Sequence, residues 1–201
     1  MRSCEPVASS SVYGPTEISP KHEELPPDPV SPYALSKYYT EQLAVQASEY
    51  YDLDSIALRY FNVFGPRQDP EGDYAAVIPK FIDLMREGER PPIYGDGTQS
   101  RDFTYIDNVN QANIHAIESD ITGEVLNVGC GESYTINTLV EELNEILGTD
   151  IEPKYTDPRP GDVPHSKADI SKARKLIDYH PEVSFREGLE RTVEWFRTYE
   201  T

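Results

Sequence analysis

The stretch from Pro32 to Lys37 restricts the fold of this chain most, because it fixes where a long helix begins. Proline is well tolerated in the first turn of a helix, where its missing N–H costs nothing. From Tyr33 to about Tyr51 the residues favour a helix, with apolar side chains recurring at three- and four-residue steps. The preceding residues 15–32 contain six prolines, which predict an irregular connection and exclude a central strand there.

Tyr33 and Lys37 are four residues apart and therefore share one face of the predicted helix. A tyrosine with its ordinary pKa of about 10 is a poor base at neutral pH. A lysine ammonium beside it favours the phenolate, which could then accept a proton from a substrate hydroxyl. The chain contains 14 tyrosines, so a pair at this spacing also arises by chance and decides nothing alone.

Three segments have the short, apolar and β-branched character of buried parallel strands. They are residues 4–14, which run into a turn, Ser55–Tyr60 and Glu124–Gly129. Helices are predicted at about 74–87, 107–118, 135–147 and 186–199, with Asp107 and Thr135 as capping residues. Two shorter strands are predicted on either side of the Gly95-Asp96-Gly97 turn.

The chain is strongly acidic, with 36 acidic and 18 basic residues and a net charge of −18. The acidic residues are scattered over predicted helix faces, so they do not form a disordered acidic tail. Such a surface repels nucleic-acid phosphates, and we expect no nucleic-acid partner. The charge suits a halophilic protein, because concentrated salt screens self-repulsion. An ordinary acidic enzyme is the alternative.

No apolar run approaches the roughly 18 residues that a membrane helix needs, and we find no signal peptide before the first motif. We therefore expect a cytoplasmic protein with no membrane partner. Cys4 and Cys130 form no Cys-x-x-Cys pair, and the four histidines are scattered. We predict no metal site.

Four further segments give the Tyr33–Lys37 pair its weight. They are VASSSVYG at 7–14, LRYFNVFGPR at 58–67, GDGTQSRDF at 95–103 and RPGDV at 159–163. In this order, from about Val7 to Phe196, the chain resembles the extended short-chain dehydrogenase/reductase family. Within this family it resembles the NAD-dependent epimerases and dehydratases most, and among them the UDP-glucose and UDP-N-acetylglucosamine 4-epimerases.

The resemblance implies an α/β fold, the C-terminal part of a Rossmann-like parallel sheet plus a smaller α/β substrate-binding lobe. Residues 1–62 and 105–130 would be the remaining part of the NAD-binding domain. Residues 63–104 and 131–201 would form the lobe that binds a nucleotide sugar. Family members commonly dimerise through the helix that follows Tyr33, which implies a homodimer here.

The resemblance also implies a catalytic set of Ser9, Tyr33 and Lys37, with NAD as the cofactor. Tyr33 would remove the proton of the sugar's 4-hydroxyl while hydride passes to NAD⁺, and hydride would return to the opposite face of the 4-keto sugar. Lys37 would lower the pKa of the tyrosine and hold the nicotinamide ribose, and Ser9 would bond the reacting oxygen. Phe61 would lie near the nicotinamide. A serine-rich strand end that merely satisfies backbone groups is the alternative for Ser9.

For a UDP-sugar substrate, the resemblance implies that Arg101 and Arg159 hold the diphosphate, as planar guanidinium groups can do in bidentate fashion. Ser166 stands where some epimerases carry a bulky tyrosine, and a serine leaves room for an N-acetyl group on C2. The full predicted set for the substrate is Ser10, Asn62, Val77, Tyr94, Arg101, Arg159, Asp162 and Ser166.

Two other functions stay open. Sugar-nucleotide dehydratases and reductases share much of this pattern, but the dehydratases need an acid where this chain has Ser10 and Ser11. A non-catalytic protein that binds nucleotide sugars is the second alternative. The sequence has no G-x-G-x-x-G or G-x-x-G-x-x-G turn for a dinucleotide pyrophosphate. We therefore expect it to be the C-terminal portion of an epimerase, with an exposed sheet edge that is prone to association.

Overall fold

The structure is a computed structural model that describes residues 7–51, 53–70, 76–159 and 163–199. A three-stranded parallel sheet is the centre of one of its two parts. The strand order is β1-β2-β7, and Leu58 of β2 is in register with Val7 on one side and Leu126 on the other. The strands are β1 (Val7–Ser9), β2 (Ile56–Tyr60) and β7 (Glu124–Val128). The predicted parallel sheet and α/β fold class are confirmed.

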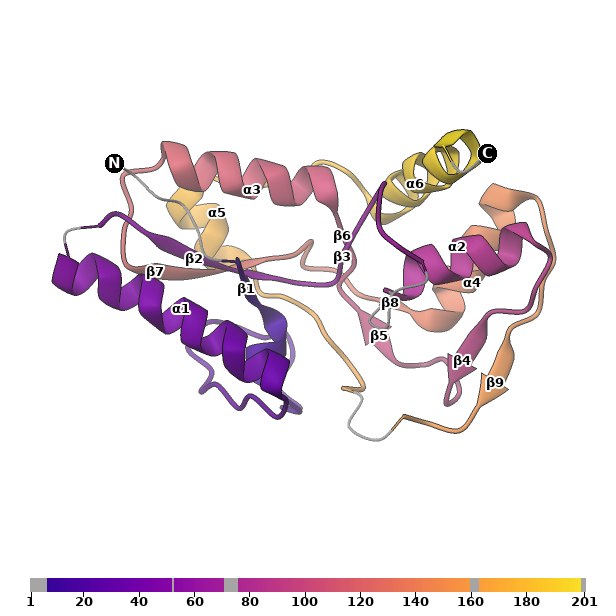
Figure 1. Cartoon of the computed structure of the whole chain (residues 1–201), viewed down its shortest axis with the longest axis horizontal. Coiled ribbons are helices and arrows are strands. Elements are labelled where there is room, and N and C mark those ends of the chain that lie inside the picture. Colours follow the sequence, from indigo (N-terminus) through magenta and orange to yellow (C-terminus); the bar gives the residue numbers. More distant parts are fainter. Residues whose placement is uncertain (1–6, 52, 71–75, 160–162, 200–201) are drawn as a thin grey trace.

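Helices cover both faces of this sheet (Figure 1). Helix α1 (Pro32–Tyr51) packs on one face, whereas α3 (Ile106–Glu118) and α5 (Ser171–Ile177) lie on the other. Pro32 occupies the first helical position, as predicted, and the Ser31 hydroxyl accepts a hydrogen bond from the Ala34 N–H at 3.1 Å. Buried side chains of the sheet, α3 and α5 form the first of two large hydrophobic cores. A small separate cluster of Ala8, Ala44 and Ala57 lies between the sheet and α1.

The second core is built by three helices and short strand pairs (Figure 1). The helices α2 (Val77–Arg86), α4 (Ile136–Leu147) and α6 (Phe185–Tyr199) pack against one another. At their centre the rings of Phe103 and Phe185 stack with centroids 5.3 Å apart. The strand pairs are β3 (Val63–Phe64) with β6 (Thr104–Tyr105), β4 (Pro92–Tyr94) with β9 (Lys154–Thr156), and β5 (Ser100–Arg101) with β8 (Tyr134–Thr135).

One of the two predicted helix caps is confirmed. The Thr135 hydroxyl accepts a hydrogen bond from the Thr138 N–H at 3.0 Å at the start of α4. Asp107 was predicted to cap α3, and this is wrong, because the capping residue is Tyr105. The Asp107 carboxylate instead lies in the first turn and accepts a hydrogen bond from Arg191 of α6 at 2.9 Å.

Helix α5 packs against β7 and α3 in the first core, although we placed residues 131–201 in the substrate-binding lobe. Ala173 and Ile177 bury their side chains beside the sheet residues Leu126 and Val128. After the helices and strands of the second core, the chain thus returns to the parallel sheet. No pattern in the sequence indicates this return. The domain boundaries as a whole stay a prediction.

Asp102 links the two cores. Its fully buried carboxylate accepts hydrogen bonds from the backbone N–H groups of Cys130 at 2.8 Å, Gly131 at 3.0 Å and Ala168 at 3.0 Å. Burial raises the pKa of this carboxyl to about 6, although the three N–H groups act in the opposite direction. Three separate segments are therefore held together directly beside Arg101.

Candidate functional site

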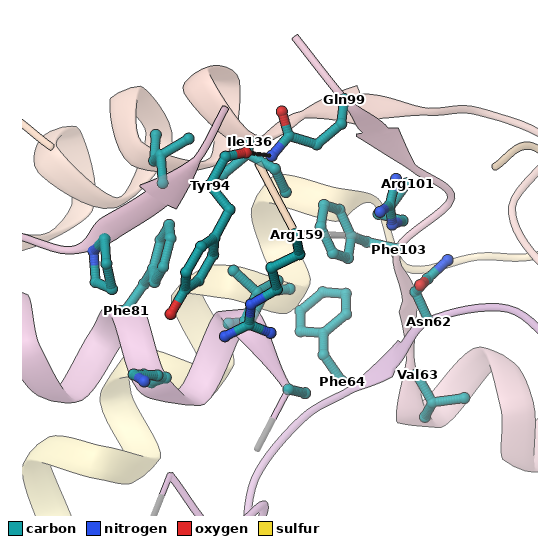
Figure 2. A pocket seen from close by; sticks show the side chains of 16 residues that line it. Asn62, Val63, Phe64, Phe81, Tyr94, Gln99, Arg101, Phe103, Ile136 and Arg159 are labelled. Atoms are coloured by element: carbon teal, nitrogen blue, oxygen red, sulfur yellow. Dashed lines mark hydrogen bonds between the residues drawn. The ribbon is translucent and has the colours of Figure 1, made fainter. Parts of the chain in front are cut away.

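A cavity of about 680 Å³ lies beside the second core, next to the segment that follows β2. Figure 2 shows the side chains that line it, from the segment after β2, from helix α2 and from β4. Its described lining includes three cationic side chains and no carboxylate, in a chain with a net charge of −18. The lining residues are Asn62, Val63, Phe64, Ala76, Val77, Ile78, Lys80, Phe81, Pro92, Ile93, Tyr94, Gln99, Arg101, Phe103, Ile136 and Arg159.

The polar side chains of the cavity are held by defined contacts. The Arg159 guanidinium carbon lies 3.7 Å from the centroid of the Tyr94 ring. The Arg101 guanidinium donates to the backbone carbonyls of Ser100 at 2.9 Å and Pro164 at 3.2 Å. Asn62 has a φ of 29°, and its amide donates to the Asp102 carbonyl at 3.2 Å. Asparagine tolerates such a left-handed backbone better than most residues do.

Five of the eight residues predicted for the substrate line this cavity. Because they come from segments far apart in the sequence, the fold alone brings them together. They are Asn62, Val77, Tyr94, Arg101 and Arg159.

The other three residues predicted for the substrate are not among the described lining residues of this cavity. Asp162 lies outside the described residues. Ser10 is half-buried in the 3₁₀ helix η1 (Ser10–Tyr13). Ser166 is buried and does not line the cavity, although its N–H donates to the Ser100 carbonyl at 3.0 Å, next to Arg101.

The predicted catalytic residues gather at one end of the parallel sheet. Because β1 and β2 are parallel, the helix between them runs back, and its first turn lies at the carboxyl ends of the strands. Tyr33 is there with 56% of its surface exposed, and the Lys37 ammonium is 5.7 Å from its ring centroid. Helix α1 also packs against η1, which begins after Ser9. The Ser9 hydroxyl accepts a hydrogen bond from the Ser11 N–H at 3.2 Å, so it also serves as a cap.

The structure does not support the predicted cofactor contact through the Phe61 side chain. This ring has no exposed surface and packs in the first core, with its centroid 6.2 Å from that of Tyr13. Alternating polar and apolar residues at this strand end do not reveal which side chain faces inward.

A buried ion pair near the predicted catalytic residues was missed in the sequence. Arg59 of β2 donates to both carboxylate oxygens of Glu41 at 2.7 Å, and the two side chains are 4% and 1% exposed. The Arg59 guanidinium carbon lies 4.7 Å from the centroid of the Tyr13 ring. Burial lowers the pKa of Arg59, but the contacts with Glu41 and Tyr13 together outweigh this effect and raise the pKa overall. The available signal was the i, i+4, i+8 spacing of Tyr33, Lys37 and Glu41.

Two polar residues of the cavity were also missed. Lys80 lies on α2 between the buried residues Pro79 and Phe81. Gln99 donates through its side chain to the Tyr94 carbonyl at 2.7 Å. The only sequence signal for Lys80 is a polar residue beside buried positions, which is common on protein surfaces. Gln99 lies two residues before Arg101 in the GDGTQSRDF segment, and this proximity was the available signal.

Comparison with known proteins identifies the family. The sequence model of the NAD dependent epimerase/dehydratase family matches residues 6–129. The chain belongs to this family. Its members use NAD, and the UDP-glucuronic acid 4-epimerase of Bacillus cereus was solved with UDP-glucuronic acid and NAD. That protein is 36% identical, with a TM-score of 0.86, and the match covers 95% of this chain and 60% of that one.

Other epimerase structures are similar over nearly the whole chain. A UDP-N-acetylglucosamine 4-epimerase from Methanobrevibacter ruminantium, in complex with UDP-N-acetylmuramic acid, is 49% identical with a TM-score of 0.92, covering 96% of this chain and 62% of that one. A UDP-glucose 4-epimerase from Thermotoga maritima, with UDP-glucose, is 42% identical with a TM-score of 0.92, covering 97% and 63%. The chain spans about three fifths of the length of the curated relatives it matches.

Tyr33 and Lys37, beside the β1 edge of the sheet, have side chains that suit the nicotinamide ribose of NAD. Among the described strands, β1 pairs with β2 alone, and Tyr33 and Lys37 stand beside this edge with exposed or half-buried side chains. A hydroxyl and an ammonium suit the ribose hydroxyls of a nicotinamide nucleotide. The printed sequence offers no glycine-rich turn for the pyrophosphate.

Within the described residues no three His, Cys, Asp or Glu side chains cluster as a metal site would require. In the same part of the chain, no helix has the length and apolar character to cross a membrane.

Proposed function

We propose that this chain carries the substrate-binding and proton-transfer residues of an NAD-dependent UDP-sugar 4-epimerase. The reaction would interconvert a UDP-hexose or a UDP-N-acetylhexosamine at C4. The observation that carries the proposal is the cavity with Lys80, Arg101 and Arg159 and no carboxylate among its described lining residues. The oxygens of a diphosphate are good acceptors for two guanidinium groups, each of which can bind in bidentate fashion. A relative with 42% identity was solved with UDP-glucose.

In this proposal the chemistry takes place at the carboxyl end of the parallel sheet. Tyr33 removes the proton of the sugar's 4-hydroxyl and later returns it, and the Ser9 hydroxyl bonds the same oxygen. Lys37, whose ammonium is 5.7 Å from the Tyr33 ring centroid, is the cation beside the reacting phenol. NAD bound beside Tyr33 and Lys37 would supply the hydride acceptor and donor at C4. Asn62 and Arg101 hold the diphosphate so that the sugar lies over Tyr33.

Removal of the Tyr33 hydroxyl group tests whether this tyrosine is the proton acceptor. Turnover of UDP-glucose is measured with added NAD⁺, on this chain and on a fusion that supplies the first part of a relative. Tyr33→Phe should abolish turnover in whichever form is active, because it removes the proton acceptor. Tyr39→Phe is the matched control, since Tyr39 is an exposed tyrosine on the same helix. Equal activity of both variants would contradict the assignment.

The sugar itself is a narrower proposal. Ser166 is adjacent to Ser100 but does not line the cavity, so the support for a substrate with an N-acetyl group on C2 comes from a relative. A 4-epimerase for UDP-N-acetylglucosamine is 49% identical to this chain over the matched region. Competition between UDP-glucose and UDP-N-acetylglucosamine for the chain measures this preference directly. Tighter binding of UDP-glucose would contradict it.

Two alternative functions, a non-catalytic binding protein and a dehydratase, predict different results in binding and turnover measurements. A non-catalytic protein would bind UDP-sugars without NAD and without turnover, and it is supported by the complete cavity in a chain that lacks the glycine-rich turn. A dehydratase would release water from the sugar nucleotide. Ser10 and Ser11 argue against a dehydratase, because hydroxyl groups are weak acids compared with a carboxylic acid.

We further propose a cytoplasmic, salt-adapted homodimer that associates through α1. The exposed side chains of Tyr39, Leu43 and Tyr50 share one stripe of this helix. An unpartnered apolar stripe of this kind is typical of a protein interface. The net charge of −18 supports higher stability in concentrated salt, because added ions screen repulsion between the acidic side chains.

A further inference from the structure

Arg159 and Tyr94 form a stacked pair inside the cavity, and Figure 2 shows the guanidinium beside the tyrosine ring. The separation of 3.7 Å between the guanidinium carbon and the ring centroid is van der Waals contact. A guanidinium is planar and binds the electron-rich face of an aromatic ring. No third planar group fits between the two, so this face of Tyr94 is closed in the free chain.

The stacked pair stands where two cavities meet. The cavity of 680 Å³ reaches it from the side of Asn62 and Arg101, and a second cavity of 420 Å³ reaches it from the side of Pro158 and His165. Tyr94, Gln99 and Arg159 line both cavities. A ligand that extends from the first cavity towards the second must therefore contact the pair.

The contact is also electrostatic. A hydrogen bond from Arg159 lowers the pKa of the Tyr94 hydroxyl, and the charges of Arg159 and Lys80 act in the same direction. No carboxylate among the described residues forms an ion pair with Arg159 within 4.0 Å. The aromatic ring is thus the described partner of a guanidinium whose preferred partners are carboxylates and phosphates.

We propose that Arg159 closes the face of Tyr94 until a phosphate group draws it away, so that the site selects nucleoside diphosphates over nucleosides. This inference rests on the proposed binding of nucleotide sugars. A base that stacks on this face must first displace Arg159. A nucleoside offers the displaced guanidinium nothing in return, whereas a diphosphate offers it two acceptor oxygens. Recognition of the phosphates and recognition of the base are thereby coupled through one side chain.

The test compares uridine and UDP on the purified chain, with ligand-observed NMR for the weak ligand and calorimetry for the strong one. Arg159→Met keeps the apolar stem and removes the guanidinium. The variant should bind uridine about two- to fivefold more tightly than the wild type, which corresponds to the loss of one exposed cation–π contact. It should bind UDP at least about tenfold more weakly, because a charged hydrogen-bonding partner of the phosphates is lost.

Lys80→Met is the matched control, because it removes a cation from the same cavity without opening the face of Tyr94. It should weaken UDP binding without any gain in uridine affinity. Opposite shifts for the two ligands in Arg159→Met, and only there, support the inference. If wild type binds UDP but Arg159→Met gains no affinity for uridine, the inference is overturned and the proposed function stands. If wild type binds neither ligand, both are overturned.

Discussion

Glu41 of α1 and Arg59 of β2 form a bidentate ion pair, with both N···O distances 2.7 Å, in the interior between helix and sheet. The pair lies one turn after Lys37 on the same helical face, and Arg59 also stacks over Tyr13. Tyr13 in turn donates a hydrogen bond to Asn127 of β7 at 2.7 Å. This chain of contacts fixes the helix that carries Tyr33 against the segment that follows Ser9.

Removal of one partner of this ion pair should destabilise the chain strongly. Arg59→Met leaves the Glu41 carboxylate buried without its cation, and we expect a loss of about 3–5 kcal/mol in the free energy of unfolding. The double variant Glu41→Leu/Arg59→Met should recover most of the loss, because buried ion pairs are often replaceable by apolar residues. Chemical denaturation measures both. A double variant as unstable as Arg59→Met would contradict this explanation.

Asp102 should give the chain a defined pH dependence. Its pKa is raised to about 6 by burial, so the folded state binds this proton more tightly than the unfolded state does. The contribution of Asp102 to stability is therefore present at low pH and is lost as the pH rises through 6. Between pH 5 and pH 7, wild type should lose roughly 1 kcal/mol relative to Asp102→Asn, which does not titrate.

The measurement is denaturation of both proteins at several pH values, and only the difference between them is interpreted. The other acidic groups contribute equally to both proteins and cancel. A difference that stays constant, or that grows in favour of wild type as the pH rises, would show that the Asp102 carboxylate is not disfavoured in the folded chain.

The sequence predicted the elements better than their inward-facing residues. The start of α1 at Pro32 and the cap at Thr135 follow from local backbone chemistry, which a single sequence displays. The inward orientation of Phe61, the pairing of Arg59 with Glu41 and the return of α5 to the sheet depend on contacts between distant segments. No local pattern reports such contacts.

The residues of the candidate site were likewise predictable only where a local motif contains them. The motifs named Asn62, Arg101 and Arg159, which line one cavity. Lys80 lies outside every motif, and Gln99 lies within the GDGTQSRDF segment, but both were assigned to the cavity only through their position in the structure. The catalytic assignment of Ser9, Tyr33 and Lys37 stays a prediction, and their common location at one sheet end follows from the parallel topology.

The stripe on α1 should mediate dimer formation. Leu43→Glu places a charge in the middle of the exposed stripe of Tyr39, Leu43 and Tyr50 and should convert a dimer to a monomer. Light scattering after size-exclusion chromatography measures the mass. Ile114→Glu is the control, because Ile114 is equally an exposed apolar residue but lies on α3, over the opposite face of the sheet. Dissociation by the Ile114 variant alone would place the interface elsewhere.

The central claim is that a binding site for the diphosphate of a nucleotide sugar lies within this chain, and calorimetric titration of the purified chain with UDP tests it most directly. We predict one UDP bound per chain, with affinity reduced about 10- to 100-fold in Arg101→Met, because charged hydrogen bonds to phosphate are lost. Lys175→Met removes the same charge from the exposed surface of α5 and should change little. Absence of UDP binding, or equal weakening in both variants, would contradict the claim.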